Sequence, residues 1–194
     1  PQALADAASA RTGVLVAPPL NFGLSPYFAR YPGTLSLRTT TFLAVIEDLV
    51  RWVHAQGFRQ LLFLNGHGGN HPATEVLSEL ANALPGLQVD WYAWWQAPSV
   101  QAVAARHNLP PNHANWLEAF SFCRVTELPE GSKPAAHPAR LLNAEATRAL
   151  YGDGVFGGPY QAPAAVMQAV FDAALADVLE AEASPWHDQP YSVT

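Results

Sequence analysis

The chain has 194 residues, of which 49% are hydrophobic and only 13% are charged, and its formal net charge is −6 at pH 7. This length allows one domain with a substantial core, so we expect a single domain over residues 1–194. The acidic balance and the single lysine, Lys133, argue against nucleic acid or an anionic membrane as partner, because both require clustered cationic side chains. A surface this poor in charge predicts burial between subunits and therefore a homo-oligomer.

Cysteine content and hydropathy indicate the cellular compartment of the protein. The one cysteine, Cys123, cannot form an internal disulfide, which agrees with a reducing compartment. No apolar run approaches the roughly 20 residues that span a bilayer, and the N-terminal residues lack the basic and apolar regions of a signal peptide. We therefore expect a cytoplasmic protein that does not enter the membrane.

The first elements of the chain alternate between helix and strand patterns. Residues 3–11 have the Ala-rich character of a helix, and residues 14–17 read as a short strand that ends at two prolines. Between residues 39 and 56, apolar side chains recur at intervals of three and four. This spacing predicts an amphipathic helix, which Gly57 closes.

The rest of the chain continues the alternation. We expect a strand at 61–64, a helix at 73–84, a strand at 89–95, a proline-containing exposed loop at 129–138 and a long helix at 164–183. Helices that separate buried strands indicate an α/β fold. Its centre would be a parallel or mixed sheet flanked by helices.

The predicted strand at 61–64 ends at the sequence NGHGGN, residues 65–70. Four successive apolar residues fit a strand buried on both faces, and ligands in open α/β sheets collect where such strands end. The glycines permit a tight turn, so the backbone at Gly68 is expected to lie close to a ligand. His67 is the side chain here that can bind a metal or move a proton. The alternative is a tight turn whose histidine caps the next helix.

Further motifs accompany this turn in a definite order: NFGLSPY at 21–27, YPGTLSL at 31–37, NHANWLE at 112–118 and GVFGGP at 154–159. Together they resemble the creatininase family of creatinine amidohydrolase-like metalloenzymes over about residues 12–183. The resemblance implies that family's α/β fold and a two-metal centre of zinc or manganese. It also implies a metal-activated water that attacks an amide carbon.

The resemblance assigns roles to three polar side chains. His67 matches the family's metal-binding histidine. Glu118 matches the carboxylate of the later motif, a metal ligand counted here among the catalytic residues, and His113 matches the histidine that contacts substrate or relays protons. Each has a structural alternative, namely a hydrogen-bonded core histidine for His67 and His113 and a solvated helix carboxylate for Glu118.

Aromatic residues stand at several motif positions where many family members have polar ones. Tyr27 and Phe28 follow the Gly-x-Ser loop, and Trp116 lies in the later motif. We expect these side chains to line an aromatic substrate pocket, with ordinary core packing as the alternative. Gly69 stands where creatininase itself has a metal-binding glutamate, so strict creatinine specificity is not expected.

Most of the family's metal ligands come from a Glu-x-His motif and an aspartate on a first strand and loop. Those positions precede the first residue of this sequence, and residues 1–11 offer no replacement. Either the natural protein has an additional N-terminal segment, or it is a shortened relative that has lost its metal chemistry. We expect the former, because the sequence opens inside a predicted helix without a cap or a preceding strand.

The sequence thus predicts a cytoplasmic, metal-dependent amidohydrolase of the creatininase type. Its substrate would be a small-molecule, cyclic amide outside peptides, and its assembly would be the hexamer that the family usually forms. The alternative is a catalytically silent assembly or binding protein that keeps the fold without the metals. The identity of the amide depends on a few loop residues, so the sequence does not name it.

Overall fold

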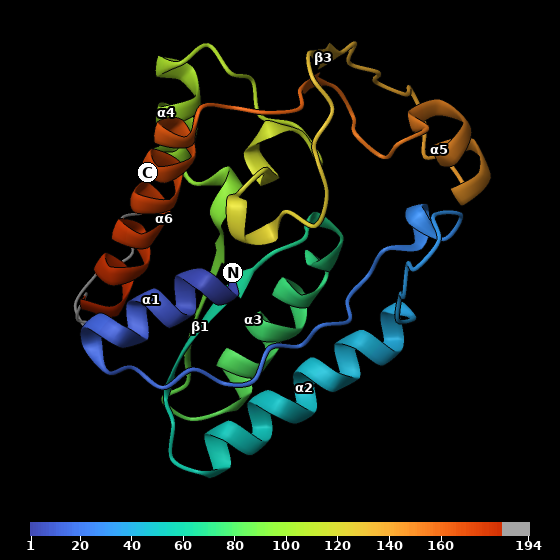
Figure 1. The fold of residues 1–194 in the computed structure, drawn as a ribbon. Helices are drawn as coiled ribbons and strands as arrows, with labels where there is room; N and C mark the ends of the chain where they lie inside the picture. The colour runs from blue at the N-terminus through green and yellow to red at the C-terminus, as the bar shows by residue number, and fades with distance from the viewer. Residues whose placement is uncertain (184–194) are drawn as a thin grey trace, which may run out of the picture. The chain divides into compact units, whose positions relative to one another are not determined.

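The computed structural model describes residues 1–183, shown in Figure 1. These residues form two compact units, which we describe separately. Unit 1 contains residues 1–24, 37–94 and 175–183, and unit 2 contains residues 25–36 and 95–174.

Unit 1 is an α/β unit built on a parallel pair of strands. Its elements are α1 (Gln2–Thr12), α2 (Thr39–Ala55), β1 (Gln60–Asn65), α3 (Ala73–Ala83) and β2 (Gln88–Ala93). The two strands pair from Gln60 opposite Gln88 to Asn65 opposite Ala93. The predicted parallel pairing is therefore present, and the helices predicted at 3–11, 39–56 and 73–84 are confirmed within a residue or two at each end.

Helices α2 and α3 lie side by side in unit 1 (Figure 1). Phe42, Ile46 and Val50 recur every four residues along α2 and are all buried, as the amphipathic pattern requires. One core cluster of this unit consists of eight buried apolar residues, Leu24, Phe42, Ile46, Val50, Ala73, Leu77, Leu80 and Leu87. Its packing holds the end of β1, and with it the glycine turn, in place.

The strand predicted at 14–17 is wrong. Residues 13–20 form neither helix nor strand, and Leu15 is 77% exposed. An apolar run becomes a strand only where a neighbouring strand takes up its backbone hydrogen bonds. No strand among residues 1–183 pairs with this one. The second predicted strand is also shorter than expected, since β2 ends at Ala93 and Trp94–Gln96 form a short 3-10 turn, η3.

Unit 2 has shorter elements, several of them unpredicted. Helices α4 (Pro98–Arg106) and α5 (Ala144–Tyr151) were not expected from the sequence, whereas α6 (Ala164–Ala183) has the predicted bounds and continues into unit 1 from residue 175. The predicted loop at 129–138 is mostly exposed. It also contains β3 (Ser132–Lys133), which pairs antiparallel with β4 (Gly158–Pro159).

None of the helices formed by the described residues has both the length and the apolar composition needed to cross a membrane.

Candidate functional site

The glycine turn of unit 1 begins at Asn65, the last residue of β1, which is only 6% exposed. Its side-chain amide nitrogen donates to the His67 carbonyl at 3.0 Å, and its side-chain oxygen accepts the His67 N–H at 3.1 Å. A buried amide that satisfies both backbone groups of one residue fixes the direction in which the chain leaves the strand. Asn65 therefore positions His67.

The His67 imidazole is held by the backbone of Leu24. Its Nε2 lies 2.9 Å from the Leu24 carbonyl oxygen. Because a carbonyl only accepts, Nε2 carries the hydrogen, and the lone pair of a neutral ring lies on Nδ1. The Leu24 N–H in turn donates to the Asn70 side chain at 3.0 Å. The Leu24 carbonyl thus orients the imidazole and determines which ring nitrogen carries the hydrogen.

This arrangement differs from a helix cap, the alternative role considered for His67. The short 3-10 turn η2 (Gly68–Asn70) starts after His67, but the His67 side chain makes no capping hydrogen bond to it. Helix α3 starts later, with Pro72 at its cap position. The imidazole is therefore oriented by Leu24 and not by a helix terminus.

Gly69 packs directly beneath this imidazole. A Cβ atom built at residue 69 would lie 2.0 Å from the Leu24 carbonyl oxygen and 2.6 Å from Nε2 of His67. Both distances are too short for any side chain. The turn therefore excludes a glutamate at this position. Gly68, by contrast, is exposed.

In unit 2, His113 lies in the loop before the 3-10 turn η4 (Trp116–Glu118). The Asn112 side chain accepts the His113 N–H at 2.9 Å, and Ala114 has a positive φ of 55°. The Ala114 N–H then donates to the Glu118 carboxylate at 2.8 Å. These contacts fold the loop tightly around residue 114.

Two buried side chains of the same loop, Asn115 and Trp116, form hydrogen bonds with neighbouring backbone carbonyls. Asn115 is 1% exposed and donates to the carbonyls of Pro110 at 3.0 Å and Gly157 at 3.2 Å. Trp116 is fully buried, and its indole N–H donates to Pro110 at 3.2 Å. Trp116 therefore has the surroundings of a core residue. Core packing was the alternative to the substrate contact predicted for this side chain.

Aromatic rings surround the His113 imidazole. Phe28, from the 3-10 turn η1 (Pro26–Phe28), stacks on it with a centroid distance of 4.9 Å and an interplanar angle of 14°. Phe156 contacts it at 4.6 Å and 48°. Tyr27, also on η1, is 43% exposed. Phe28, His113 and Phe156, which are far apart in the sequence, thus meet at one place.

Tyr151 supports Phe156 from the end of α5. Their rings stack with centroids 3.9 Å apart, and the Tyr151 hydroxyl donates to the Ala136 carbonyl. Burial raises the pKa of Tyr151, and the nearby Tyr31 raises it further. Tyr151 therefore remains protonated and neutral at physiological pH, as an apolar support requires.

A polar cluster of Lys133, Asp153 and Tyr160 links β3 to the two residues that flank the GVFGGP motif at 154–159. Lys133 binds the Asp153 carboxylate, and the Tyr160 hydroxyl donates to the same carboxylate at 2.8 Å. Burial alone would raise the pKa of Asp153, but the hydrogen bonds from Lys133, Tyr160 and the Val155 N–H outweigh it and lower that pKa. The bond to Asp153 raises the pKa of Tyr160.

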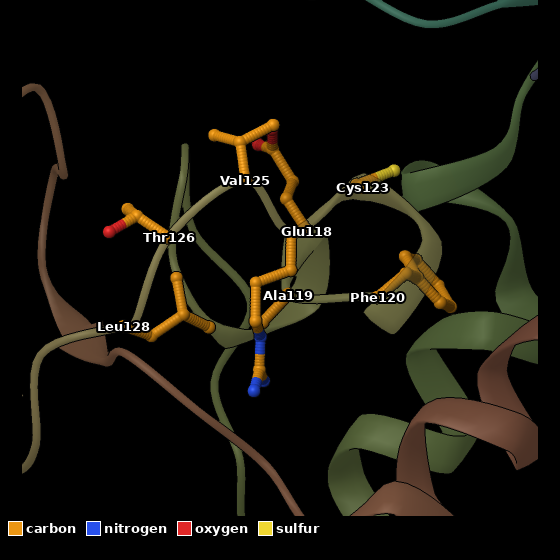
Figure 2. A pocket seen from close by; sticks show the side chains of 8 residues that line it. Glu118, Ala119, Phe120, Cys123, Val125, Thr126 and Leu128 are labelled. Atoms are coloured by element: carbon orange, nitrogen blue, oxygen red, sulfur yellow. The ribbon is translucent and has the colours of Figure 1, made fainter.

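The Glu118 side chain is exposed and borders two hollows of unit 2. One, of about 110 Å³, lies against the 118–128 segment and is shown in Figure 2. The other, of about 250 Å³, lies between Glu118, Asp153 and Tyr160. Both hollows are small beside the 300–1,000 Å³ typical of small-molecule sites.

The predicted site residues fall in both units. His67 and Gly68 belong to unit 1, and the others belong to unit 2, where Phe28 and His113 are in contact. Sequence reasoning did not single out Asn65, Asn115 or Phe156. The two asparagines stood inside recognised motifs, but only the fold shows which backbone groups they bind.

The predicted metal centre requires several donor side chains close together. Nowhere among residues 1–183 do three or more His, Cys, Asp or Glu side chains gather in a way that could hold a metal ion. Two-metal sites need several such ligands around each ion. The described residues therefore do not by themselves fit a two-metal centre, and the roles of His67 and Glu118 as ligands stay predictions.

Comparison with solved structures defines the class of fold. A mutant creatininase described as the Zn–Zn type superposes with a TM-score of 0.74 at 19% identity, covering 93% of this chain and 79% of the other. A manganese creatininase superposes with a TM-score of 0.72 at 21% identity and the same coverage. The protein therefore has a creatininase-like α/β fold.

Sequence comparison defines the family. The profile of the creatininase family, described as creatinine amidohydrolase, matches residues 1–181, and the chain belongs to this family. A curated relative, 3-dehydro-scyllo-inosose hydrolase of Thermotoga maritima, is 24% identical over 196 aligned positions. The alignment covers 92% of this chain but only 63% of that relative, so the chain spans less than two thirds of its length.

Proposed function

We propose that the protein is a metal-dependent amidohydrolase of the creatininase type, which hydrolyses a non-peptide, cyclic amide C–N bond. Membership of the family over residues 1–181 supports this proposal, as does a curated relative that is named a hydrolase. The observation that carries it is the glycine turn. Here Leu24, Asn65 and Gly69 together hold one imidazole in a single orientation.

Zinc or manganese is part of the proposal, because structural relatives are described as Zn–Zn and manganese forms. His67 and Glu118 are the ligands that this chain would offer, and His113 would contact substrate or move a proton. No three such donor side chains cluster among residues 1–183, so a complete metal site would need ligands besides these two.

The setting of this activity is also proposed. We infer a cytoplasmic homo-oligomer, a hexamer, that takes a small-molecule amide and binds neither nucleic acid nor membrane. The support is the low proportion of charged residues and the net charge of −6, which leave few cationic side chains for a polyanionic partner.

A second candidate is a catalytically silent assembly or binding protein with the creatininase fold. This second candidate is favoured because both predicted metal ligands form hydrogen bonds with the protein's own backbone. Nε2 of His67 binds the Leu24 carbonyl, and the Glu118 carboxylate accepts the Ala114 N–H. Such bonds are also what a purely structural histidine and carboxylate would make.

Hydrolysis of a panel of cyclic amides separates the two candidates. We expect turnover by the wild-type protein that a chelator abolishes and added zinc or manganese restores. His67→Ala should abolish it, whereas His71→Ala, an exposed histidine beside the same turn, should retain it. Turnover that survives His67→Ala would contradict the assignment of His67. A wild-type protein inactive with both metals would favour the silent candidate.

A further inference from the structure

We propose that Phe156, together with Phe28, positions the His113 imidazole for its role in proton transfer. This inference rests on the proposed function and adds residues to it. Phe156 lies inside the GVFGGP motif at 154–159, and the sequence alone assigns no role to it. The sequence predicts that Phe28 contacts substrate. In the structure, Phe28 stacks on His113, and we assign it a positioning role there.

The three ring centroids define the contact. Phe28 lies 4.9 Å from His113, Phe156 lies 4.6 Å from it, and the two phenylalanines are 6.0 Å apart. Because all three distances are similar, the two rings meet the imidazole from different directions and form a corner around it.

The corner is tied to the loop that it supports. The Phe156 N–H donates to the His113 carbonyl at 3.1 Å, so the backbone and the ring of Phe156 both hold residue 113. Behind Phe156 lies Tyr151, which is 4% exposed and stacked at 3.9 Å. A ring supported in this way cannot move aside without disturbing the end of α5.

The two possible roles of these rings predict different kinetics. A ring that binds substrate contributes to binding, so its loss raises KM. A ring that orients His113 contributes to the step in which His113 moves a proton, so its loss lowers kcat. Misplacing a catalytic group by about 1 Å can cost on the order of a hundredfold in rate.

Phe156→Leu removes the ring and keeps an apolar side chain, and Phe156→Tyr keeps the ring. We expect Phe156→Leu to lower kcat at least tenfold, by analogy with that misplacement cost, with little change in KM. Phe156→Tyr should restore kcat. Phe122→Leu is the matched control, because Phe122 is 60% exposed and its ring contacts are to Phe120 and Phe171. A rise in KM alone would overturn the proposal.

Proton NMR of the His113 ring detects its contact with Phe28 and Phe156 without a substrate. The signals of His113, identified by their loss in His113→Gln, should be displaced upfield by the ring currents of Phe28 and Phe156. We expect this displacement to shrink in Phe156→Leu and in Phe28→Leu, and to persist in Phe122→Leu. Unchanged His113 signals in both phenylalanine variants would overturn the proposal. If the wild-type protein hydrolyses no amide, the proposed function fails, and the NMR comparison still decides whether the rings hold His113.

Discussion

The imidazole rings of two histidines in this protein contact different kinds of groups. In unit 1, hydrogen bonds orient His67, with Leu24 at the imidazole and Asn65 at the backbone. In unit 2, the rings of Phe28 and Phe156 pack against His113. A hydrogen bond to a carbonyl determines which ring nitrogen carries the proton, whereas ring contacts restrict orientation without themselves selecting a tautomer.

The difference suits the roles proposed for the two side chains. A metal-binding histidine must present one ring nitrogen with a lone pair, and a hydrogen bond from the other ring nitrogen is the usual means of ensuring this. A proton-relay group must hold its position while its protonation changes. The comparison therefore predicts that the His67 turn is sensitive to lost hydrogen bonds and added volume, and the His113 region to lost rings and altered charge.

The largest effect is expected from Gly69→Ala. The added Cβ would lie 2.0 Å from the Leu24 carbonyl oxygen, which contacts His67, so the chain must shift there. We expect a loss of about 3 kcal/mol in the free energy of unfolding, measured by urea denaturation. Gly57→Ala is the control, because Gly57 has a positive φ of 97° and open space around it. It should cost only about 1–2 kcal/mol, and equal losses would contradict the steric account.

Asn65→Ala should have the next largest effect. It removes both side-chain bonds to His67 and leaves a partly buried backbone N–H without its acceptor. We expect a loss of about 2 kcal/mol in the free energy of unfolding. Gln60→Ala, at the exposed start of the same strand, should change it by less than about 0.5 kcal/mol. A result for Asn65→Ala as small as that of Gln60→Ala would show that the amide does not hold the turn.

The Lys133, Asp153 and Tyr160 cluster makes unit 2 sensitive to pH. Because the pKa of Asp153 is lowered in the folded protein, its contribution to stability is present above its unfolded pKa and lost as pH falls through the folded value. The raised pKa of Tyr160 works in the opposite direction. Its contribution is present below its unfolded pKa, about 10, and is lost as pH rises through the folded value.

Asp153→Asn tests this dependence. The Asp153 side chain is 44% exposed, so solvent limits the effect to about 1 kcal/mol or less. We expect the variant to be less stable than the wild type at pH 7 and to lose less stability on going to pH 3. Stability curves that run parallel between these pH values would contradict the ion-pair account of this region.

Glu145→Gln should have the smallest effect. The Arg30–Glu145 pair has a separation of 3.3 Å, and both side chains are largely exposed, at 64% and 79%. We expect a change of less than about 0.5 kcal/mol that vanishes at high salt. Thermal denaturation at low and high ionic strength measures it. A larger, salt-independent loss would mean that this surface pair holds η1 against α5.

Much of unit 1 could be predicted, because its patterns are local. The four-residue spacing in α2 and the apolar run of β1 each contain the information that the element needs. Residues 14–17 show the limit of such patterns, since Val14 to Val16 look like a strand but have no partner among the described residues. Pairing is a tertiary property that composition does not report.

Unit 2 was harder to predict because its elements are short and depend on distant contacts. Helix α4 begins with Pro98 and buries Val100 and Val103, and α5 begins after Asn143, whose side chain accepts the Ala146 N–H. These start signals were present in the sequence and were not used. The corner around His113 had no such signal.

Part of the candidate site could likewise be predicted from the sequence, and part could not. His67 and its glycines could be found from the motif, because the motif is contiguous in the sequence. The Leu24 carbonyl that orients the imidazole lies 43 residues away, and only the folded chain brings the two together. The contact between Phe156 and His113 is likewise tertiary, so the sequence alone does not show it.

The central claim is that His67 is a metal ligand in a hydrolytic enzyme. Elemental analysis of the protein, prepared without chelator, tests it most directly when the wild type is compared with His67→Ala and the His71→Ala control. The account predicts bound zinc or manganese in the wild type and in His71→Ala, and its loss in His67→Ala without a change in fold. Equal metal content in all three proteins, or none in the wild type, would contradict it.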